Sequence, residues 1–290
     1  MNNQDNEKVF QKSQINWYPG HMAKTKRLIV EKGNLIDIVY ELVDARIPFS
    51  SKIKNIYDVV GDKPKIIIMT KKDLCDEKVT NVWINYYEHL GTPVLLLDLN
   101  DGDGINKIVS LTHELTKDIQ EKRRNKGMKE KSIRALVVGI PNVGKSTLIN
   151  KMCKRRVANV GNSPGVTKNL TWLKTDYGIE LLDTPGILWP KLDNETVALN
   201  LAAFTAIKQE ILPINDVAYY IIKSLKKYYP NVLDSVYHVD NSLSVMEIID
   251  TIANNIGAIK MGEVDYNRVC TKIVNDIKLE SIKGITFDRK

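Results

Sequence analysis

Two motifs stand in an unusual order along this chain. Residues 139–146 read G-I-P-N-V-G-K-S and fit the phosphate-loop pattern G-x-x-x-x-G-K-[ST]. Residues 70–73, well upstream, read T-K-K-D and are close to the N-K-x-D motif that contacts guanine. Domains that carry both motifs commonly have the phosphate loop first. Either the upstream match is a chance one, or the domain is circularly permuted.

Short apolar runs alternate with helical patterns in the first part of the chain. Before residue 121 the expected strands are 36–43, 65–69 and 93–97, and the expected helices are 53–60, 76–90 and 105–120. Strands that alternate with helices build a parallel, doubly wound sheet. The first part is therefore expected to be an α/β domain, in which residues 70–73 directly follow a strand.

A polar segment separates these elements from the phosphate loop. Residues 121–132 are basic and contain a glycine, which predicts a linker. Residues 134–138 are then expected to form the strand that leads into the phosphate loop, and 146–152 to open a helix. Two further strands are expected at 172–174 and 180–182.

The pattern changes after residue 190. Helical periodicity without alternating strands predicts four helices, at 197–209, 216–229, 244–255 and 266–279. We place a boundary near residues 188–196, with one domain over 1–190 and a small all-α domain over 191–290. A chain of 290 residues has room for two such units.

Composition excludes several classes of protein. No run approaches 18 consecutive apolar residues, so no membrane span is expected. The polar N-terminus lacks the apolar core of a secretory signal. Three distant cysteines argue against a zinc site or a disulfide scaffold and favour a reducing compartment, which together predict a cytoplasmic protein.

The charge is distributed unevenly. From Glu195 onward there are 11 Lys and Arg residues against 12 Asp and Glu residues, a net charge of −1, so the first 194 residues carry a net charge of +8. A basic first part makes a polyanion such as RNA a candidate partner, although a solvated cationic surface explains the charge equally well.

The phosphate loop predicts specific chemistry. A glycine-rich turn between a strand and a helix directs backbone N–H groups at phosphate oxygens, and the helix dipole adds positive potential. Lys145 is expected to reach the β- and γ-phosphates, and the Ser146 hydroxyl to ligate Mg²⁺. The residues expected to contact the nucleotide here are Asn142, Val143, Gly144, Lys145, Ser146 and Thr147.

Two downstream segments fit the same site. Asp183 opens D-T-P-G at the end of an apolar run, where its carboxylate can hold Mg²⁺ through water and the Gly186 N–H can meet the γ-phosphate. Residues 163–167 resemble a first switch, in which Thr167 would complete the Mg²⁺ shell. A plain surface loop remains the alternative for this second segment.

Asp73 decides which base is bound. Its carboxylate can accept hydrogen bonds from guanine N1–H and the 2-amino group, a pair that adenine does not present. Within the same motif the Lys71 stem is expected to pack over the base, beside Lys72. Thr70 replaces the usual asparagine, which puts one polar tie to the base or the phosphate loop in doubt. Read alone, T-K-K-D is also compatible with a charged turn.

Two further positions depart from the common GTPase pattern. Asp98 and Leu99 follow the third expected strand, where a second guanine contact is expected, but their side chains do not match the usual Ser-Ala. Ile187 occupies the position of the glutamine that orients the attacking water, and its side chain forms no hydrogen bond. Hydrolysis is therefore expected to be slow unless a partner or another residue positions the water.

The chain closely resembles the circularly permuted GTPases typified by the bacterial ribosome biogenesis GTPase A. The matching motifs are residues 17–22 (W-Y-P-G-H-M), 44–48 (D-A-R-I-P), 70–73, 139–146 and 183–190 (D-T-P-G-I-L-W-P). The resemblance covers most of residues 15–190 and continues more loosely through the helical tail. It implies a circularly permuted Ras-like P-loop GTPase domain, a mostly parallel doubly wound sheet, followed by the small all-α domain.

The resemblance also implies a function. Members of the family act in late assembly of the large ribosomal subunit, binding precursor particles and hydrolysing GTP when docked, and their helical domain contacts ribosomal RNA. By the same resemblance His21 is the catalytic histidine, and Asn142 is the asparagine associated with stimulation by K⁺. The expected partners are GTP or GDP and the precursor subunit with its rRNA, with no membrane and a monomer away from the ribosome.

Several alternatives remain open at this stage. His21 can equally be a surface histidine of an N-terminal arm. RNA contacts by the nearly neutral tail would depend on local patches such as Lys223, Lys226 and Lys227. A regulatory module that uses GTP to recruit an RNA or protein partner, with hydrolysis incidental, fits the same motifs, as does a metabolic ATPase or kinase if Asp73 does not read guanine.

Overall fold

The chain is described by a computed structural model covering residues 27–54, 60–157, 171–184, 194–204, 206–207 and 211–290. We call residues 27–184 of this part the α/β domain and residues 194–290 the helical domain. Within the described residues, no helix has both the length and the apolarity that a membrane span requires.

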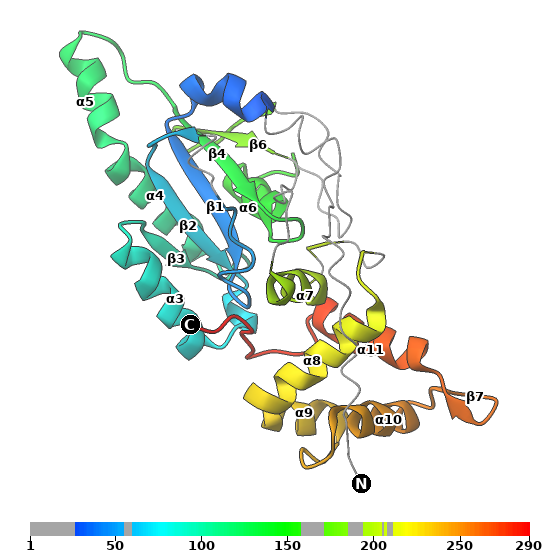
Figure 1. The fold of residues 1–290 in the computed structure, drawn as a ribbon. Helices are drawn as coiled ribbons and strands as arrows, with labels where there is room; N and C mark the ends of the chain where they lie inside the picture. The colour runs from blue at the N-terminus through cyan, green and yellow to red at the C-terminus, as the bar shows by residue number, and fades with distance from the viewer. Residues whose placement is uncertain (1–26, 55–59, 158–170, 185–193, 205, 208–210) are drawn as a thin grey trace.

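A six-stranded sheet forms the centre of the α/β domain (Figure 1). Its strands are β1 (Ile38–Asp44), β2 (Lys65–Thr70), β3 (Val94–Leu96), β4 (Ile133–Gly139), β5 (Thr171–Lys174) and β6 (Ile179–Asp183). The order across the sheet is β3-β2-β1-β4-β6-β5, and only β5 runs antiparallel to its neighbour. All strands expected from the sequence are confirmed.

The sheet shows the circular permutation directly. β4, which leads into the phosphate loop, is fourth along the chain but lies inside the sheet between β1 and β6. β1 alone separates it from β2, the strand that ends at Thr70. Because these strands are parallel, the T-K-K-D motif and the phosphate loop emerge at the same edge of the sheet, and the upstream match is part of one fold.

Both faces of the sheet are covered. Alternate residues such as Tyr40, Ile68 and Val137 lie in a core with α4 (Asp103–Leu115) and α6 (Lys145–Met152). On the other side, one cluster packs α3 (Glu77–His89) against β2. The strands are buried along nearly their whole length, as expected for a parallel sheet between two helical layers.

Two expectations for the middle of the chain were wrong. The single helix predicted over 105–120 is divided at Thr116 into α4 and α5 (Lys117–Asn125). The hydroxyl of Thr116 donates a hydrogen bond to the Thr112 carbonyl at 2.7 Å, and its backbone leaves the helical region. The linker predicted over 121–132 therefore begins inside a helix. The helix predicted over 53–60 lies mostly outside the described residues.

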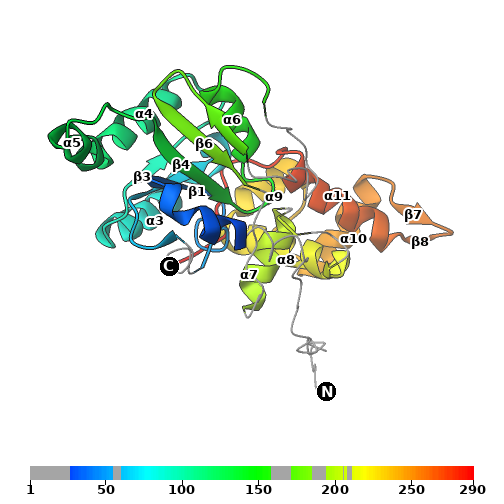
Figure 2. The same ribbon diagram turned by 90° about the horizontal axis from the view of Figure 1, so that it is seen from above.

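The helical domain extends to one side of the sheet (Figure 2). Its helices are α7 (Glu195–Ala203), α8 (Ile214–Tyr228), α9 (Pro230–Tyr237), α10 (Val245–Asn255) and α11 (Tyr266–Lys278). The helices predicted over 216–229, 244–255 and 266–279 are confirmed, the one predicted over 197–209 ends earlier, at Ala203, and α9 was missed. The expectation of no strands was also wrong, because β7 (Ile259–Lys260) and β8 (Glu263–Val264) form a short hairpin. Its turn residues Met261 and Gly262 both have positive φ, as the tight hairpin turn requires.

The end of the chain returns to the α/β domain. The C-terminus lies beside α3 in Figures 1 and 2. The Phe287 N–H donates to the Arg46 carbonyl at 2.8 Å, and the Ile285 N–H donates to the Leu74 carbonyl at 3.2 Å. The Trp83 indole N–H donates to the Asp288 carbonyl at 3.3 Å. The helical domain is thus joined to the α/β domain by its last residues as well as by its first helix.

Candidate nucleotide-binding site

The phosphate loop joins β4 to α6. Gly144 has φ +100°, and a side chain there would be strained and would meet Leu99 at 3.0 Å. A Cβ atom on Gly139 would lie 2.8 Å from the Leu42 carbonyl oxygen. Asn142 also has positive φ, at 61°. The loop therefore needs glycine at two positions for close backbone approach, which is the reason a phosphate loop is rich in glycine.

Lys145 lies at the first turn of α6 with its side chain buried. Its ammonium donates hydrogen bonds to the carbonyl oxygens of Gly139 and Ile140, at 3.0 and 2.7 Å. Burial lowers the pKa of Lys145 to about 8, and the charge of Asp183 opposes this shift only in part. The ammonium is thus held over the loop in surroundings that favour additional negative charge, as phosphate oxygens would supply.

Asp183 ends β6 beside the phosphate-loop strand. Its backbone is in register with Val137 of β4, and its side chain is buried. The next residue fixes this corner, because the Thr184 hydroxyl donates to the Val137 carbonyl at 2.7 Å. The Asp183 carboxylate and the half-buried hydroxyl of Ser146, at the start of α6, are oxygen ligands of the kind that Mg²⁺ prefers. The residues present fit this cation.

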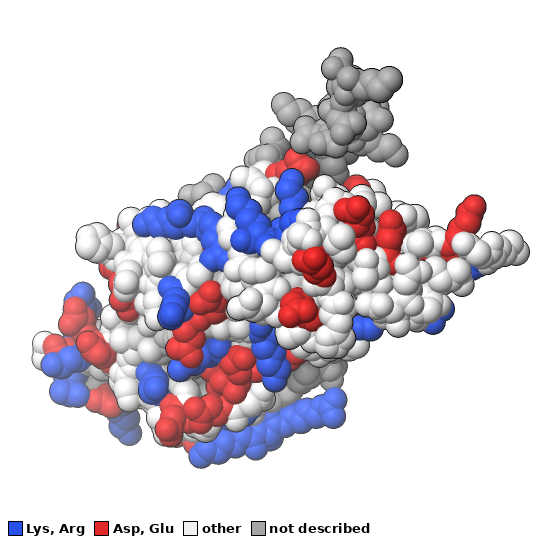
Figure 3. Space-filling view, turned by 90° about the horizontal axis from the view of Figure 1, so that it is seen from below, with Lys and Arg blue, Asp and Glu red and all other residues white. Residues whose placement is uncertain are grey.

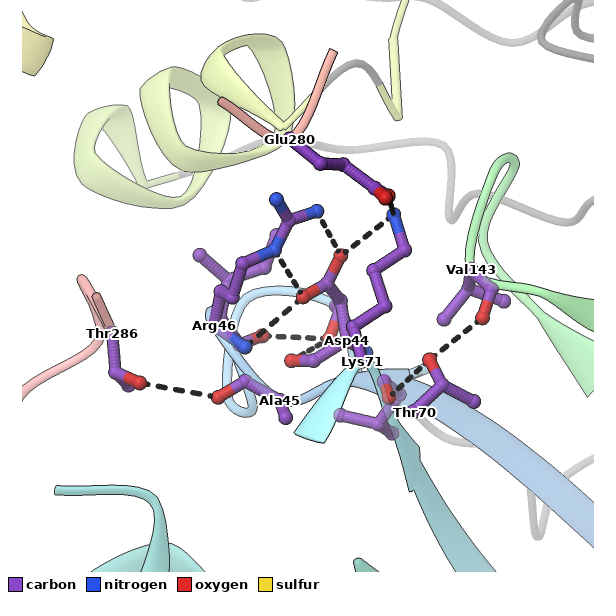
Figure 4. Close-up of polar contacts among 11 residues, drawn as sticks. Asp44, Ala45, Arg46, Thr70, Lys71, Val143, Glu280 and Thr286 are labelled. Carbon is purple, nitrogen blue, oxygen red and sulfur yellow. Dashed lines mark hydrogen bonds and ion pairs between the residues drawn. The ribbon is translucent and has the colours of Figure 1, made fainter. Parts of the chain in front are cut away.

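Thr70 ties the T-K-K-D motif to the phosphate loop. Its hydroxyl lies 2.8 Å from the Val143 carbonyl oxygen, to which it donates, and 3.3 Å from the Val43 carbonyl. The tie that the threonine put in doubt is therefore present in the structure (Figure 4). The Thr70 hydroxyl therefore makes the contact with the phosphate loop that the asparagine of N-K-x-D was expected to make.

A pocket of about 210 Å³ opens beside this tie. It is lined by both motifs, by the loop after β3 and by one residue of the helical domain: Thr70, Lys71, Asp73, Leu74, Asp98, Leu99, Asn100, Val143, Gly144, Thr147 and Glu280. Of the residues expected to read the base, Thr70, Lys71, Asp73, Asp98 and Leu99 come together here. Lys72 does not line the pocket, and its ammonium lies 3.8 Å from Glu77 instead.

Asp73 and Asp98 lie at the same pocket. Burial, and then the nearby Asp98 carboxylate, raise the pKa of Asp73 above its ordinary value. Asp98 is held by its own turn, because its carboxylate accepts the Asn100 N–H at 2.7 Å. A guanine base that donates N–H groups to Asp73 would offset the repulsion between the two carboxylates. In place of a Ser-Ala pair, the loop after β3 presents Asp98, Leu99 and Asn100 to the pocket.

A buried ion pair lies beneath Lys71. Arg46 donates to both oxygens of Asp44, at 3.0 and 2.8 Å, and the two side chains are almost fully buried. Burial alone would raise the pKa of Asp44, but the charges of Arg46 and Lys71 hold it well below its ordinary range. No role for this pair follows from the sequence. The one signal was an apolar strand that ends in D-A-R, where charged residues interrupt a buried run.

Four residues of the predicted catalytic and switch region lie outside the described residues, together with most of the motifs that contain them. These are His21, Thr167, Gly186 and Ile187. The roles expected of them are therefore predictions from sequence. The described part of the site consists of the phosphate loop, Asp183 and the pocket around Asp73.

Comparison with known proteins places the chain in a family. The family described as "50S ribosome-binding GTPase" matches residues 134–254. Ribosome biogenesis GTPase A of Bacillus licheniformis is 44% identical over 277 residues, with 95% of this chain and 98% of that protein covered. The protein of the same name from Priestia megaterium is also 44% identical, with 94% and 96% covered.

Solved structures show the same fold. The GDP-bound structure of YlqF from T. maritima superposes with a TM-score of 0.64 at 23% identity, covering 91% of this chain and 99% of that one. The GNP-bound structure gives 0.63 at 24% identity, covering 92% and 98%. Since the Bacillus and Priestia relatives match over nearly their whole length, and the fold and the motifs agree, this chain belongs to the Ribosome biogenesis GTPase A family.

Proposed function

We propose that the protein is a GTPase of late large-subunit assembly, which binds precursor particles and their rRNA and hydrolyses GTP when docked. The observation that carries this proposal is the pocket that joins the T-K-K-D motif to the phosphate loop within a chain of this family. The family's description names 50S binding, and the relatives' name refers to ribosome biogenesis. We further propose that the protein acts in the cytoplasm and is a monomer away from the ribosome.

Two parts of the site would bind the base and the phosphates of the nucleotide separately. Asp73 accepts the guanine N–H groups, while the loop from Asn142 to Thr147 surrounds the phosphates and Lys145 neutralises their charge. Ser146 and Asp183 would hold Mg²⁺, with Thr167 as a further ligand in the triphosphate state. When bound, the cation neutralises charge on the phosphate oxygens during phosphoryl transfer.

Hydrolysis depends on residues beyond this framework. Ile187 has no group to orient water, so we propose that His21 supplies the missing contact once the protein is docked. Asn142 would hold K⁺ near the phosphates, where its charge does part of the work of an arginine finger. Added positive charge at this position is worth about 10³–10⁵ in rate. Slow intrinsic turnover and stimulation by the particle follow from this arrangement.

Local surface groups support contact with RNA. Lys227 and Arg289 lie over the ring of Tyr228, at 4.9 and 4.2 Å from its centroid, and Tyr228 is 37% exposed. Aromatic faces beside cations suit unpaired bases and phosphates. The face in Figure 3 mixes Lys and Arg with Asp and Glu, rather than presenting one broad basic field. RNA contact through the helical domain would therefore depend on such local groups.

The direct test is the GTPase rate with purified large subunits, in K⁺ and in Na⁺ buffer. We expect a large stimulation by particles that is greater in K⁺. Equal rates with and without particles would reject the proposed coupling to the ribosome. Cosedimentation with precursor particles without any stimulation would instead favour a GTP-dependent binding module.

A second test concerns His21. The His21→Ala variant should lose the stimulated rate while its affinity for GDP stays nearly unchanged. His89→Ala is the matched control, because His89 is an exposed residue at the end of α3. A large loss of nucleotide affinity in His21→Ala would assign the histidine a structural role.

A further inference from the structure

One lining residue of the nucleotide pocket comes from the far end of the sequence. Glu280 follows α11 of the helical domain and lines the same pocket as Asp73 and Thr147. Its backbone has φ +62°, a left-handed conformation that glutamate rarely adopts. This turn ends the helix and directs the chain toward the α/β domain. The expected guanine site of this fold therefore includes a group supplied by the helical domain.

Glu280 contacts the lysine of the T-K-K-D motif. The Lys71 ammonium lies 3.5 Å from a carboxylate oxygen of Glu280 and 3.5 Å from one of Asp44 (Figure 4). Lys71 also has positive φ, at 62°, which projects its side chain from the turn after β2. The ammonium is therefore held between a carboxylate of the sheet edge and a carboxylate of the helical domain.

The two carboxylates are not equivalent. Asp44 already accepts two hydrogen bonds from the Arg46 guanidinium, so its charge is largely compensated. Glu280 is about half exposed, and Lys71 is the partner of its ion pair among the described residues. Contacts on both sides of the ammonium order the long, flexible side chain of Lys71. The stem of this side chain is expected to lie over the base. An ordered side chain loses less entropy when the base binds.

The segment that carries Glu280 is anchored on both sides of the motif. Beyond Glu280, the Ile285 N–H donates to the Leu74 carbonyl, and the Phe287 N–H donates to the Arg46 carbonyl. Leu74 directly follows Asp73, and Arg46 belongs to the ion pair beneath Lys71. The helical domain thus contacts the loop after β1 and the loop after β2 at the same edge of the sheet.

We propose that Glu280 is a positioning residue for guanine recognition: it holds Lys71 across the pocket and so links the seating of the helical domain to nucleotide binding. This inference rests on the proposed guanine-reading role of residues 70–73. Linkage of this kind is reciprocal, because a helical domain that strengthens nucleotide binding is itself held more firmly when the nucleotide is bound.

A competing effect has the opposite sign. Glu280 adds negative charge near Asp73 and contributes, after burial and Asp98, to the raised pKa of that carboxyl. If repulsion dominated, removal of the Glu280 charge would tighten nucleotide binding. If the contact with Lys71 dominates, the same change weakens binding. The direction of the change therefore separates the two effects.

The experiment measures the dissociation constant and the off-rate of mant-GDP for the full-length protein, for Glu280→Gln, for Lys71→Met and for the double variant. We expect Glu280→Gln to weaken binding about two- to five-fold, the range of a partly exposed ion pair, mainly through a faster off-rate. In the Lys71→Met background the same change should no longer weaken binding. Glu263→Gln, in the exposed hairpin, is the matched control and should bind like the wild type.

A second readout tests the link to the helical domain. Addition of GDP should slow hydrogen exchange at the Ile285 and Phe287 amides in the wild type, and this response should be weaker in Glu280→Gln. Unchanged or tighter binding by Glu280→Gln, an equal loss in the Lys71→Met background, or an equal exchange response would each overturn the inference. A wild-type protein that binds no mant-GDP would instead reject the guanine site itself.

Discussion

The hydroxyl of Thr70 donates a hydrogen bond to the backbone carbonyl of Val143 at 2.8 Å. The donor ends the strand of the guanine motif, and the acceptor lies in the phosphate loop. The two residues are 73 apart in sequence. The T-K-K-D motif, which is proposed to read the base, and the phosphate loop come from distant parts of the chain, and this bond ties them together.

The Thr70→Val substitution should remove the hydrogen bond between the T-K-K-D motif and the phosphate loop. It keeps the shape of the side chain but removes the donor, and a buried hydrogen bond of this kind contributes about 1 kcal/mol. We expect the free energy of unfolding without nucleotide to fall by about 1 kcal/mol, measured by urea denaturation, and the affinity for GDP to fall in parallel. Thr70→Ser keeps the hydroxyl and should lose less of both. Equal affinities in all three proteins would mean that the bond does not position the loop.

The guanine assignment of Asp73 is tested by exchanging the base. Asp73→Asn replaces two acceptor oxygens with an amide, which suits the extra carbonyl of xanthine in place of the 2-amino group. Preference should shift from GDP toward XDP, measured by competition against mant-GDP. Lys72→Met is the control, because Lys72 lies outside the pocket beside Glu77, and its GDP affinity should stay within about two-fold, as expected for an exposed ion pair. Unchanged selectivity in Asp73→Asn would reject the assignment.

Features of this site that depend on contiguous residues could be predicted from the sequence. The strands that end at Asp44, Thr70 and Asp183 are mostly apolar runs, which are visible in the sequence alone. The phosphate loop is likewise a contiguous pattern, so its placement was predicted. The break at Thr116 was not predicted, because the helical periodicity continues through it and only the threonine hydroxyl bonds mark it.

Contacts between distant segments were beyond prediction for a physical reason. Glu280 reads as an ordinary charged residue near a helix end, and nothing in its neighbours indicates a contact with Lys71. Its position depends on how the helical domain packs and on a left-handed turn at a non-glycine residue. The same holds for the last residues of the chain, whose partners in the α/β domain lie far upstream in sequence.

Lys145 gives a prediction about proton uptake. Its pKa is lowered to about 8 by burial, so near pH 8 about half of the free molecules carry the charge. Phosphate oxygens favour the charged form and raise this pKa in the complex. GDP binding should therefore take up about half a proton at pH 8, less at pH 7 and more at pH 9. Titration calorimetry in buffers of different ionisation enthalpy measures this uptake.

The control for this measurement is Lys145→Met, which has no group to titrate. It should bind GDP more weakly and without the proton uptake near pH 8. Uptake that persists in Lys145→Met would assign the titration to another group. No uptake in the wild type would mean that the Lys145 ammonium stays fully charged despite its burial.

Asp288 holds the C-terminal segment against the α/β domain. Its carboxylate accepts hydrogen bonds from the Phe49 and Ser50 backbone N–H groups, both at 2.7 Å, and from the Ser50 hydroxyl at 2.6 Å. The Asn200 amide of α7 donates to it at 2.8 Å. One buried side chain therefore joins the end of the chain to the loop after β1 and to the first helix of the helical domain.

Asp288→Ala should be strongly destabilising, because it leaves several buried donors without an acceptor. Loss of hydrogen bonds to a charged group predicts a fall of about 3 kcal/mol in the free energy of unfolding, against a negligible change for the exposed Asp234→Ala control. Because Asp288 anchors the segment that carries Glu280, the variant should also weaken mant-GDP binding by about the same factor as Glu280→Gln. A stable Asp288→Ala protein with wild-type affinity would show that neither the anchor nor the nucleotide site depends on this carboxylate.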